Sequence, residues 1–115
     1  YDTVFPESCK AYAMQGADLR LCMAAAPVTS RPSFERVIPS RAVENTCPMV
    51  YVNNVGSQLN MVFFGGSQAY DARGRCLAKL PYLREAVEVL DVDMLQTEPA
   101  RRARPTIRDS LGSLR

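Results

Sequence analysis

The first 23 residues, YDTVFPESCKAYAMQGADLRLCM, place a helix start and a strand in direct succession. Pro6 suits the first turn of a helix, because proline has no N–H group to lose there, and Glu7 meets the positive end of the helix dipole. Gly16 is a suitable terminator, and residues 19–23 carry an apolar side chain at every second position. The stretch therefore predicts the second half of a strand–turn–helix unit that continues into another strand.

A second helix and a second strand follow. The small residues of the loop at 24–32 end at Pro32, and Ser33 is a candidate N-cap for the helix. The buried stripe predicted for this helix consists of Phe34, Val37, Ile38, Ala42 and Val43. Pro39 lies inside the helix and is expected to kink it. The run CPMVYVNNV at 47–55 is a continuous apolar strand, which indicates that both of its faces are covered.

The region 61–80 contains the clearest hairpin pattern in the chain. Gly65 and Gly66 interrupt its first apolar run, and the sequence DARG forms a turn. The segments on either side of that turn, 67–71 and 75–80, are therefore predicted to pair as antiparallel strands.

Three further segments complete the predicted pattern. GSQLN at 56–60 reads as a loop, and EAVEVLDVDM at 85–94 alternates loosely as a last strand. Everything after Gln96 is rich in Pro and Arg without a repeating apolar face, so we expect it to lie against another surface. The order of elements predicts an α/β fold with about half the layers of an α-β sandwich, and hence a piece of a larger fold. We divide it into a body, 1–96, and a C-terminal arm, 97–115.

Charge is distributed unevenly along the chain. The formal net charge is +2, but five of the 14 basic residues lie in 101–115, where Asp109 is the single acid. The rest of the chain is slightly acidic, which gives no support to nucleic-acid binding. No apolar run approaches the ~18 residues that cross a bilayer, and no charged-then-apolar signal segment begins the chain. We therefore expect a cytoplasmic protein that binds neither nucleic acid nor membrane.

Four cysteines and the absence of histidine limit the available chemistry. Cys9, Cys22, Cys47 and Cys76 form no CxxC pair, so a metal site is not expected. Cys9 and Cys22 fall in patterns typical of small buried thiols in a reducing compartment, and a disulfide framework is the less favoured alternative. A Ser/His or Cys/His pair cannot form within the chain. A catalytic base would be a carboxylate, a lysine or a group from elsewhere.

A series of short motifs in a fixed order points to one family. They are YDTVFPE at 1–7, GADL at 16–19, RAVEN at 41–45, VNNVG at 52–56, FFGGSQAYDARGRCLAKLP at 63–81 and VLDVD at 89–93. Together they resemble the C-terminal half of the nitrilase superfamily, the carbon-nitrogen hydrolases, and RARPTIRD at 102–109 is similar to that family's C-terminal arm. The resemblance implies that residues 1–96 are half of a four-layer αββα sandwich. It also implies that an N-terminal half outside this chain completes the fold, and that no cofactor is needed.

The resemblance implies a catalytic triad that this chain does not contain. In the family, a Cys thiolate attacks an amide or nitrile carbon, a Glu acts as general base and acid, and a Lys stabilises the oxyanion. Tyr1 and Asp2 match the two positions after that cysteine, so the nucleophile is expected immediately before Tyr1 and the Glu and Lys further upstream. Three explanations are open: cleavage beside the nucleophile with the N-terminal half still bound, a modified cysteine left out of a longer chain, or a separately encoded half.

The resemblance also implies roles for residues that are present. Those expected near the oxyanion or the substrate are Tyr1, Ala25, Ala26 and Asn53, and those expected to support the site are Glu7, Arg41, Glu44 and Asn45. Tyr1 would act through its backbone N–H group, with a frayed terminus as the alternative. For Glu7, an ordinary first-turn acid is the favoured interpretation. The alanines would leave room for a substrate, but runs of alanine are more often ordinary packing. Cys9 and Cys22 are disfavoured as nucleophiles, because a reactive thiol needs an accessible, electropositive setting.

The loop NNVGSQLN at 53–60 favours one substrate class. It is similar to the equivalent loop of the glutaminase domains of glutamine-dependent NAD synthetases, which favours a primary amide over a nitrile. We therefore predict part of an amidase that converts a small carboxamide to a carboxylic acid and ammonia through a Cys thioester. The alternative is a non-catalytic structural or assembly subunit of a carbon-nitrogen hydrolase-like complex. In either case, the arm is expected to join copies into a homo-oligomer.

Overall fold

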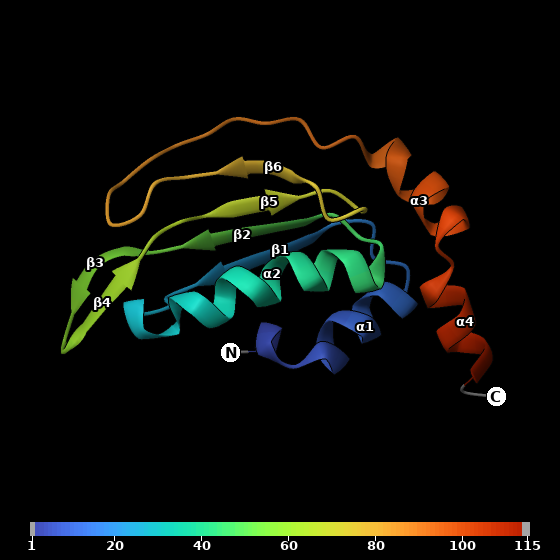
Figure 1. The fold of residues 1–115 in the computed structure, drawn as a ribbon, viewed down its shortest axis with the longest axis horizontal. Helices are drawn as coiled ribbons and strands as arrows, with labels where there is room; N and C mark the ends of the chain where they lie inside the picture. Colours follow the sequence, from blue (N-terminus) through green and yellow to red (C-terminus); the bar gives the residue numbers. More distant parts are fainter. Residues whose placement is uncertain (1, 114–115) are drawn as a thin grey trace.

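The computed structural model describes residues 2–113 and has a mixed α/β fold (Figure 1). The helices are α1 (Pro6–Met14), α2 (Arg31–Asn45), α3 (Thr97–Ala103) and α4 (Thr106–Ser113). The strands are β1 (Arg20–Ala24), β2 (Met49–Asn53), β3 (Val55–Gln58), β4 (Met61–Phe64), β5 (Gln68–Tyr70) and β6 (Cys76–Lys79). Three 3₁₀ turns are η1 (Asp2–Val4), η2 (Val28–Ser30) and η3 (Met94–Gln96). Among residues 2–113, no helix has the length and apolar character that a bilayer crossing requires.

The main sheet has the strand order β1-β2-β5-β6. β1 and β2 are parallel, with Cys22 opposite Tyr51, and the other two pairs are antiparallel. A parallel pair needs a crossover connection, which α2 supplies. β3 and β4 form a separate two-stranded sheet at the end of the molecule opposite α3 and α4 (Figure 1). The predicted succession of helix, strand, helix and strand is confirmed.

The core lies between α2 and the main sheet, and α1 covers the same face (Figure 1). Ile38 and Ala42 of α2 are fully buried together with Met49 and Tyr51 of β2, and the Phe34 ring stacks on Tyr51 at 5.5 Å between centroids. Each large apolar side chain buried in this way contributes about 1.5–3 kcal/mol. The predicted stripe on α2 is therefore confirmed at its centre, and its other members are half-buried.

Helix α2 starts earlier than predicted. The predicted N-cap Ser33 lies inside the helix, which begins at Arg31, and Ser30 occupies the cap position without a side-chain hydrogen bond. Pro32 explains the difference, because its fixed φ and missing N–H suit the first helical turn. Pro39 lies within the helix, which continues to Asn45.

The opposite face of the sheet carries exposed apolar side chains. Leu21 and Met23 of β1 are 70% and 89% exposed, and Val52 of β2 is 51% exposed. Cys22, between the first two, packs against the core, as the alternation of a strand requires. The prediction that β2 is covered on both faces is therefore wrong within the described chain, where helices cover one face of the sheet.

Strands β4, β5 and β6 confirm the predicted hairpin region. Gly65 and Gly66 have φ of +68° and +62° and separate β4 from β5. A Cβ atom on Gly66 would lie 2.6 Å from the Tyr82 ring, so glycine is required there. β5 pairs with β6 across a turn in which Asp71 Oδ1 accepts two backbone hydrogen bonds of 2.9 Å.

Two segments differ from the sequence-based expectations. Residues 56–60 are part of the β3–β4 hairpin, with Leu59 at φ +55° in its turn, where a loop was predicted. Residues 85–93 form an open, elongated trace with no strand partner in the described chain, and η3 begins at Met94, where a last strand was predicted (Figure 1). Apolar alternation favours a strand, but a strand also needs a neighbour for its backbone groups.

The C-terminal arm folds into α3 and α4 and packs on its own chain. Arg101 Nη2 donates a 2.6 Å hydrogen bond to the Ala17 carbonyl, and Lys10 Nζ of α1 donates one of 2.9 Å to Ser110 Oγ of α4. Ile107 of α4 is buried. The prediction that the arm lies against another surface is confirmed, and its role between copies stays a prediction.

Candidate functional site

The turn η1 is held in place by the guanidinium group of Arg41. Its Nε donates a 3.0 Å hydrogen bond to the Thr3 carbonyl, and its Nη2 donates one of 2.8 Å to the Val4 carbonyl. The Arg41 side chain is 10% exposed. A guanidinium is a planar, permanently charged fork of donors, so it can bind two successive carbonyl groups at once. Helix α2 thereby fixes the path of the backbone that follows Asp2.

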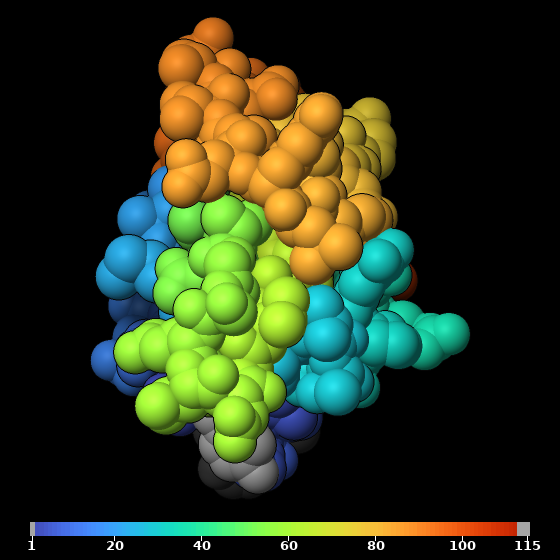
Figure 2. Space-filling model, turned by 90° about the vertical axis from the view of Figure 1, so that its left-hand side faces the viewer, coloured from blue at the N-terminus to red at the C-terminus, as the bar shows by residue number. Residues whose placement is uncertain are grey.

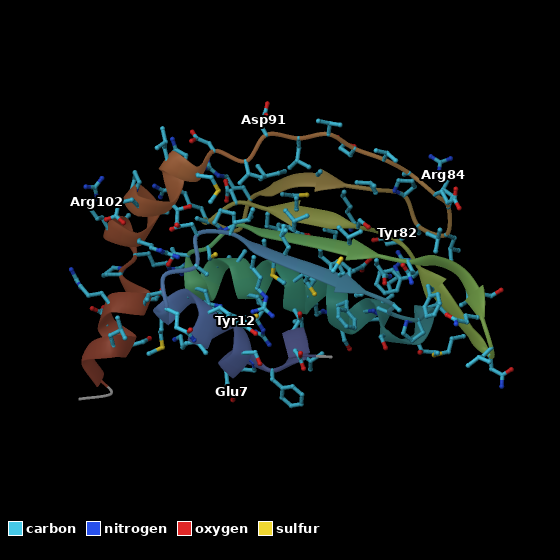
Figure 3. All side chains as sticks on the ribbon, turned by 180° about the vertical axis from the view of Figure 1, so that it is seen from behind. Glu7, Tyr12, Tyr82, Arg84, Asp91 and Arg102 are labelled. Carbon is cyan, nitrogen blue, oxygen red and sulfur yellow. The ribbon has the colours of Figure 1, made fainter. Side chains whose placement is uncertain are left out.

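Arg41 is itself held by two residues that were predicted to support the site. Glu44 Oε1 accepts a 3.0 Å hydrogen bond from Arg41 Nη1, and Asn45 Nδ2 donates one of 2.9 Å to the Arg41 carbonyl. The structure therefore brings together Arg41, Glu44 and Asn45. Glu7 lies apart from them: it is exposed on α1 and points away from the sheet (Figure 3).

A second contact ties η1 to the sheet. Thr3 is 3% exposed, and its Oγ1 lies 3.0 Å from the Sγ of Cys22 on β1. Sequence reasoning missed this role for Thr3, because the contact joins residues 19 positions apart and leaves no local pattern. Tyr1, predicted to act at the oxyanion, lies outside the described residues.

The side chain of Asn53 joins three loops at one end of the sheet. Its Oδ1 accepts a 2.7 Å hydrogen bond from the Ala26 N–H, and its Nδ2 donates to the carbonyls of Ala26 and Gly65 at 3.3 and 3.0 Å. Asn53 is 7% exposed, and its own N–H donates to Ser67 Oγ at 3.0 Å. Its amide is thus committed to the backbone that follows β1 and β4.

Ala25 and Ala26 lie directly after β1, beside the end of β2. Ala26 is 4% exposed and is bound by Asn53 through both backbone groups, whereas Ala25 is exposed. The carboxyl ends of parallel strands are where open α/β sheets bind ligands. Of the residues predicted to face a substrate, Ala25 is the one that the described chain leaves open.

A charged and aromatic cluster that the sequence analysis missed lies nearby. Tyr82 donates a hydrogen bond to Glu35 Oε1, Arg31 Nε lies 3.0 Å from the same oxygen, and the Arg31 guanidinium stacks 3.5 Å from the Tyr82 ring centroid. The hydrogen bond from Tyr82, followed by that from Arg31, lowers the pKa of Glu35 below its ordinary value. Tyr82 lies 47 positions from Glu35, so local patterns could not reveal the pair. The cluster ties the first turn of α2 to the chain after β6.

The cysteines are free thiols in different surroundings. Cys9 and Cys47 are 3% and 5% exposed, and burial raises the pKa of both thiols above the ordinary value, although nearby arginines oppose the shift. Cys76 is exposed. Within residues 2–113, no group of three or more His, Cys, Asp and Glu side chains could hold a metal ion.

We expect a maleimide reagent to label Cys76 first and to leave Cys9 and Cys47 unreacted in the folded protein. Burial blocks access to these two thiols and raises their pKa, which lowers the fraction of reactive thiolate relative to an ordinary thiol. Mass spectrometry of a labelling time course, with a denatured sample as control, measures the order. Rapid labelling of Cys9 in the folded state would identify it as a reactive thiol and contradict this assignment.

Known proteins match nearly the whole chain. The sequence model of the carbon-nitrogen hydrolase family matches residues 1–102. The probable nitrilase of Schizosaccharomyces pombe is 31% identical over 102 residues, which are 89% of this chain and 38% of that protein. The glutamine-dependent NAD(+) synthetase of a Synechocystis species is 29% identical over 86 residues, which are 73% of this chain and 15% of that protein.

Solved structures share the fold. The carbon-nitrogen hydrolase from Helicobacter pylori G27 has a TM-score of 0.83 and is 25% identical to this chain. The match covers 94% of this chain and 43% of the Helicobacter chain. A second match is a mutant of the amidase from Nesterenkonia sp. AN1 that carries the acetamide moiety of fluoroacetamide covalently at its active site cysteine. It has a TM-score of 0.68 and is 35% identical, and the match covers 90% of this chain and 39% of the amidase chain. The chain thus spans less than half the length of these relatives. From the extent of these matches, the chain belongs to the carbon-nitrogen hydrolase family.

Proposed function

We propose that this chain is the C-terminal half of a nitrilase-like amidase that hydrolyses a small carboxamide to a carboxylic acid and ammonia. A cysteine immediately before Tyr1 is the nucleophile, and a Glu and a Lys lie further upstream. The anchoring of η1 carries the proposal, because Arg41 binds the carbonyls of Thr3 and Val4 directly after the nucleophile's position. A nucleophile on a sharp turn needs such support, since small displacements of the attacking atom cost much of the rate.

The proposed reaction proceeds in two stages. The Cys thiolate adds to the amide carbon while the Lys stabilises the oxyanion, and the Glu gives a proton to the nitrogen, so that ammonia leaves and a thioester remains. The Glu then takes a proton from water, which attacks the thioester carbon and releases the carboxylic acid and the thiolate, so that the thiolate and the protonated Glu are restored for the next cycle. This chain's share is to hold the turn that carries the nucleophile.

An amide substrate is favoured over a nitrile by the relatives that act on amides. The Nesterenkonia amidase carries an acetamide adduct on its cysteine, and the NAD(+) synthetase depends on glutamine, itself a primary amide. A nitrile remains the alternative, because the S. pombe relative is named as a nitrilase.

We further propose individual roles at this site. The Tyr1 N–H helps to bind the oxyanion, Ala25 and Ala26 line the substrate pocket, and Asn53 shapes it through the loops that it joins. Arg41, Glu44 and Asn45 support the turn, and Glu7 adds a first-turn charge on α1. Ala25 is the exposed one among the pocket residues that the structure describes, which leaves room for a substrate group.

The rest of the fold is proposed to come from the N-terminal half. The apolar face of the sheet, with Leu21, Met23 and Val52, gives that half a surface to cover and so builds the four-layer αββα sandwich. Residues 1–96 are the hydrolase half and 97–115 an arm that joins copies into a homo-oligomer. Free, buried thiols suit the reducing cytoplasm.

Intact-mass measurement and N-terminal sequencing of the protein from its source test this proposal. We expect a polypeptide with the Cys, Glu and Lys, joined to this chain or copurifying with it, and release of ammonia from small carboxamides. Replacing that cysteine with alanine should reduce ammonia release at least about a thousandfold, while Cys76→Ser, at an exposed thiol, leaves it unchanged. The lack of such a polypeptide would favour a non-catalytic assembly subunit instead.

A further inference from the structure

The C-terminal end of helix α2 carries the side chains that hold η1. Arg41 donates hydrogen bonds to the carbonyls of Thr3 and Val4, and Glu44 Oε1 accepts a 3.0 Å hydrogen bond from Arg41 Nη1. These contacts keep η1 in one place only if the end of α2 keeps its own shape. The last carbonyl groups of a helix have no partner within the helix, so the shape of this end depends on what caps it.

The chain that follows α2 caps its end incompletely. The N–H groups of residues 46–47 donate to the carbonyls of residues 42–43 at 3.2 and 3.3 Å, but Pro48 has no N–H group to offer the Glu44 carbonyl. Thr46 is 2% exposed and has φ of +44°, a left-handed conformation that is costly for a β-branched residue. Further contacts are needed to satisfy Glu44 and to hold Thr46.

The C-terminal arm supplies these contacts. Thr106 Oγ1 of α4 donates a 3.0 Å hydrogen bond to the Glu44 carbonyl and lies 3.3 Å from Thr46 Oγ1. Arg101 Nε of α3 donates one of 3.3 Å to the Thr46 carbonyl. Ile107, next to Thr106, is buried and fixes this part of α4 against the body. The arm is therefore the cap at the end of α2.

The two ends of α2 are held by different parts of the chain. Figure 1 shows α3 and α4 beside the end of the helix, and Figure 2 shows its start, in cyan, at the surface of the opposite end of the molecule. At that start, Glu35 accepts hydrogen bonds from Arg31 and Tyr82. The arm thus acts on the end of α2 that carries Arg41 and Glu44.

We propose that Thr106 is a positioning residue for the nucleophile. Its hydroxyl group caps α2 at Glu44, the Glu44 carboxylate holds Arg41, and Arg41 holds η1. This assigns the arm a role within its own chain, besides the role between copies that is proposed above. The inference rests on the proposed function, which places the nucleophile immediately before Tyr1.

Thr106→Val in the complete hydrolase tests the proposal, because valine has a similar shape but forms no hydrogen bond. We expect kcat for carboxamide hydrolysis to fall about tenfold, with KM changed less than about twofold. Thr106→Ser keeps the hydroxyl group and should retain at least about half of the wild-type kcat. A fall in the thermal midpoint of Thr106→Val with kcat at the wild-type value would overturn the proposal.

Thr97→Val is the matched control on the same arm. Thr97 is 3% exposed, and its Oγ1 has no hydrogen-bond partner among residues 2–113. Removal of a hydroxyl group without a partner is nearly neutral, so kcat should stay within about twofold of the wild-type value. A loss of kcat equal to that of Thr106→Val would assign the effect to the arm's packing and contradict a specific role for Thr106.

A double variant tests whether Thr106 acts through Arg41. Once Arg41→Ala has broken the link to η1, adding Thr106→Val should lower kcat by less than about twofold more. A further tenfold loss would show that Thr106 affects the reaction by another route, and the proposed link would be wrong.

Hydrogen–deuterium exchange separates this inference from the proposed function. The Phe5 N–H donates to the Asp2 carbonyl at 3.2 Å across η1, so its exchange rate measures how firmly η1 is held. Thr106→Val is expected to raise this rate at least about fivefold, and Thr97→Val to leave it unchanged. An unchanged rate in Thr106→Val would overturn the inference and leave the proposed function intact. A raised rate in a protein that hydrolyses no carboxamide would confirm the hold on η1 and overturn the proposed function.

Discussion

Replacing Arg41 with alanine is expected to lower kcat for carboxamide hydrolysis by roughly a hundredfold, with KM changed less than about threefold. Arg41 binds the carbonyls of Thr3 and Val4 and is almost buried, so its removal frees η1, the turn proposed to follow the nucleophile, and leaves both carbonyls without their donors. The residues proposed to line the substrate pocket, Ala25 and Asn53, do not contact Arg41, so KM should change little. Steady-state kinetics of the complete hydrolase, with kcat and KM resolved separately, measure the effect.

Two control variants separate positioning from general stability. Arg41→Lys keeps the charge but lacks the planar fork, so we expect it to reach one carbonyl and to recover part of the lost kcat. Arg36→Ala lies on the exposed side of the same helix and should leave kcat unchanged. If Arg41→Ala lowers the thermal midpoint while kcat stays at the wild-type value, Arg41 has no part in placing the nucleophile.

Local sequence signals were sufficient to predict those helix and strand boundaries that depend on a few neighbouring residues. Pro6 marks the start of α1 because proline fits the first turn, and the glycine pair at 65 and 66 marks the break between β4 and β5 because φ is positive there. The hairpin of β5 and β6 follows from its turn residues. The start of α2 was predicted too late, at Ser33, because Pro32 next to it is the stronger signal for the first helical turn.

Long-range features could not be predicted from local patterns. Asn53 meets Ala26 27 positions away, and the pairing of Glu35 with Tyr82 needs the whole sheet to be assembled first. The mispredictions at β2 and at 85–94 have another cause. Both patterns are those of strands covered on two sides, and the described chain provides one side. On the proposed function, these apolar residues are the ones that the second half of the sandwich covers.

Asn53→Ala is expected to reduce the free energy of unfolding by about 3–5 kcal/mol, because three hydrogen bonds to buried backbone groups are lost together. The partners left behind are the N–H and carbonyl of Ala26 and the carbonyl of Gly65. Denaturant titration of the complete hydrolase measures the loss. Asn54→Ala is the matched neighbour: its side chain is exposed, its two backbone hydrogen bonds survive the change, and the cost should stay within about 0.5 kcal/mol.

Asn53→Asp sharpens the test, because a carboxylate keeps the acceptor for the Ala26 N–H but turns the two donor contacts into repulsion between oxygens. The carbonyls would raise the pKa of the new carboxyl in the folded state, so the variant should gain stability relative to the wild type as the pH falls from 7 toward about 4. If instead both variants unfold like the wild type and lose amide hydrolysis alone, the Asn53 side chain acts on the substrate, and the three backbone contacts do not define its role.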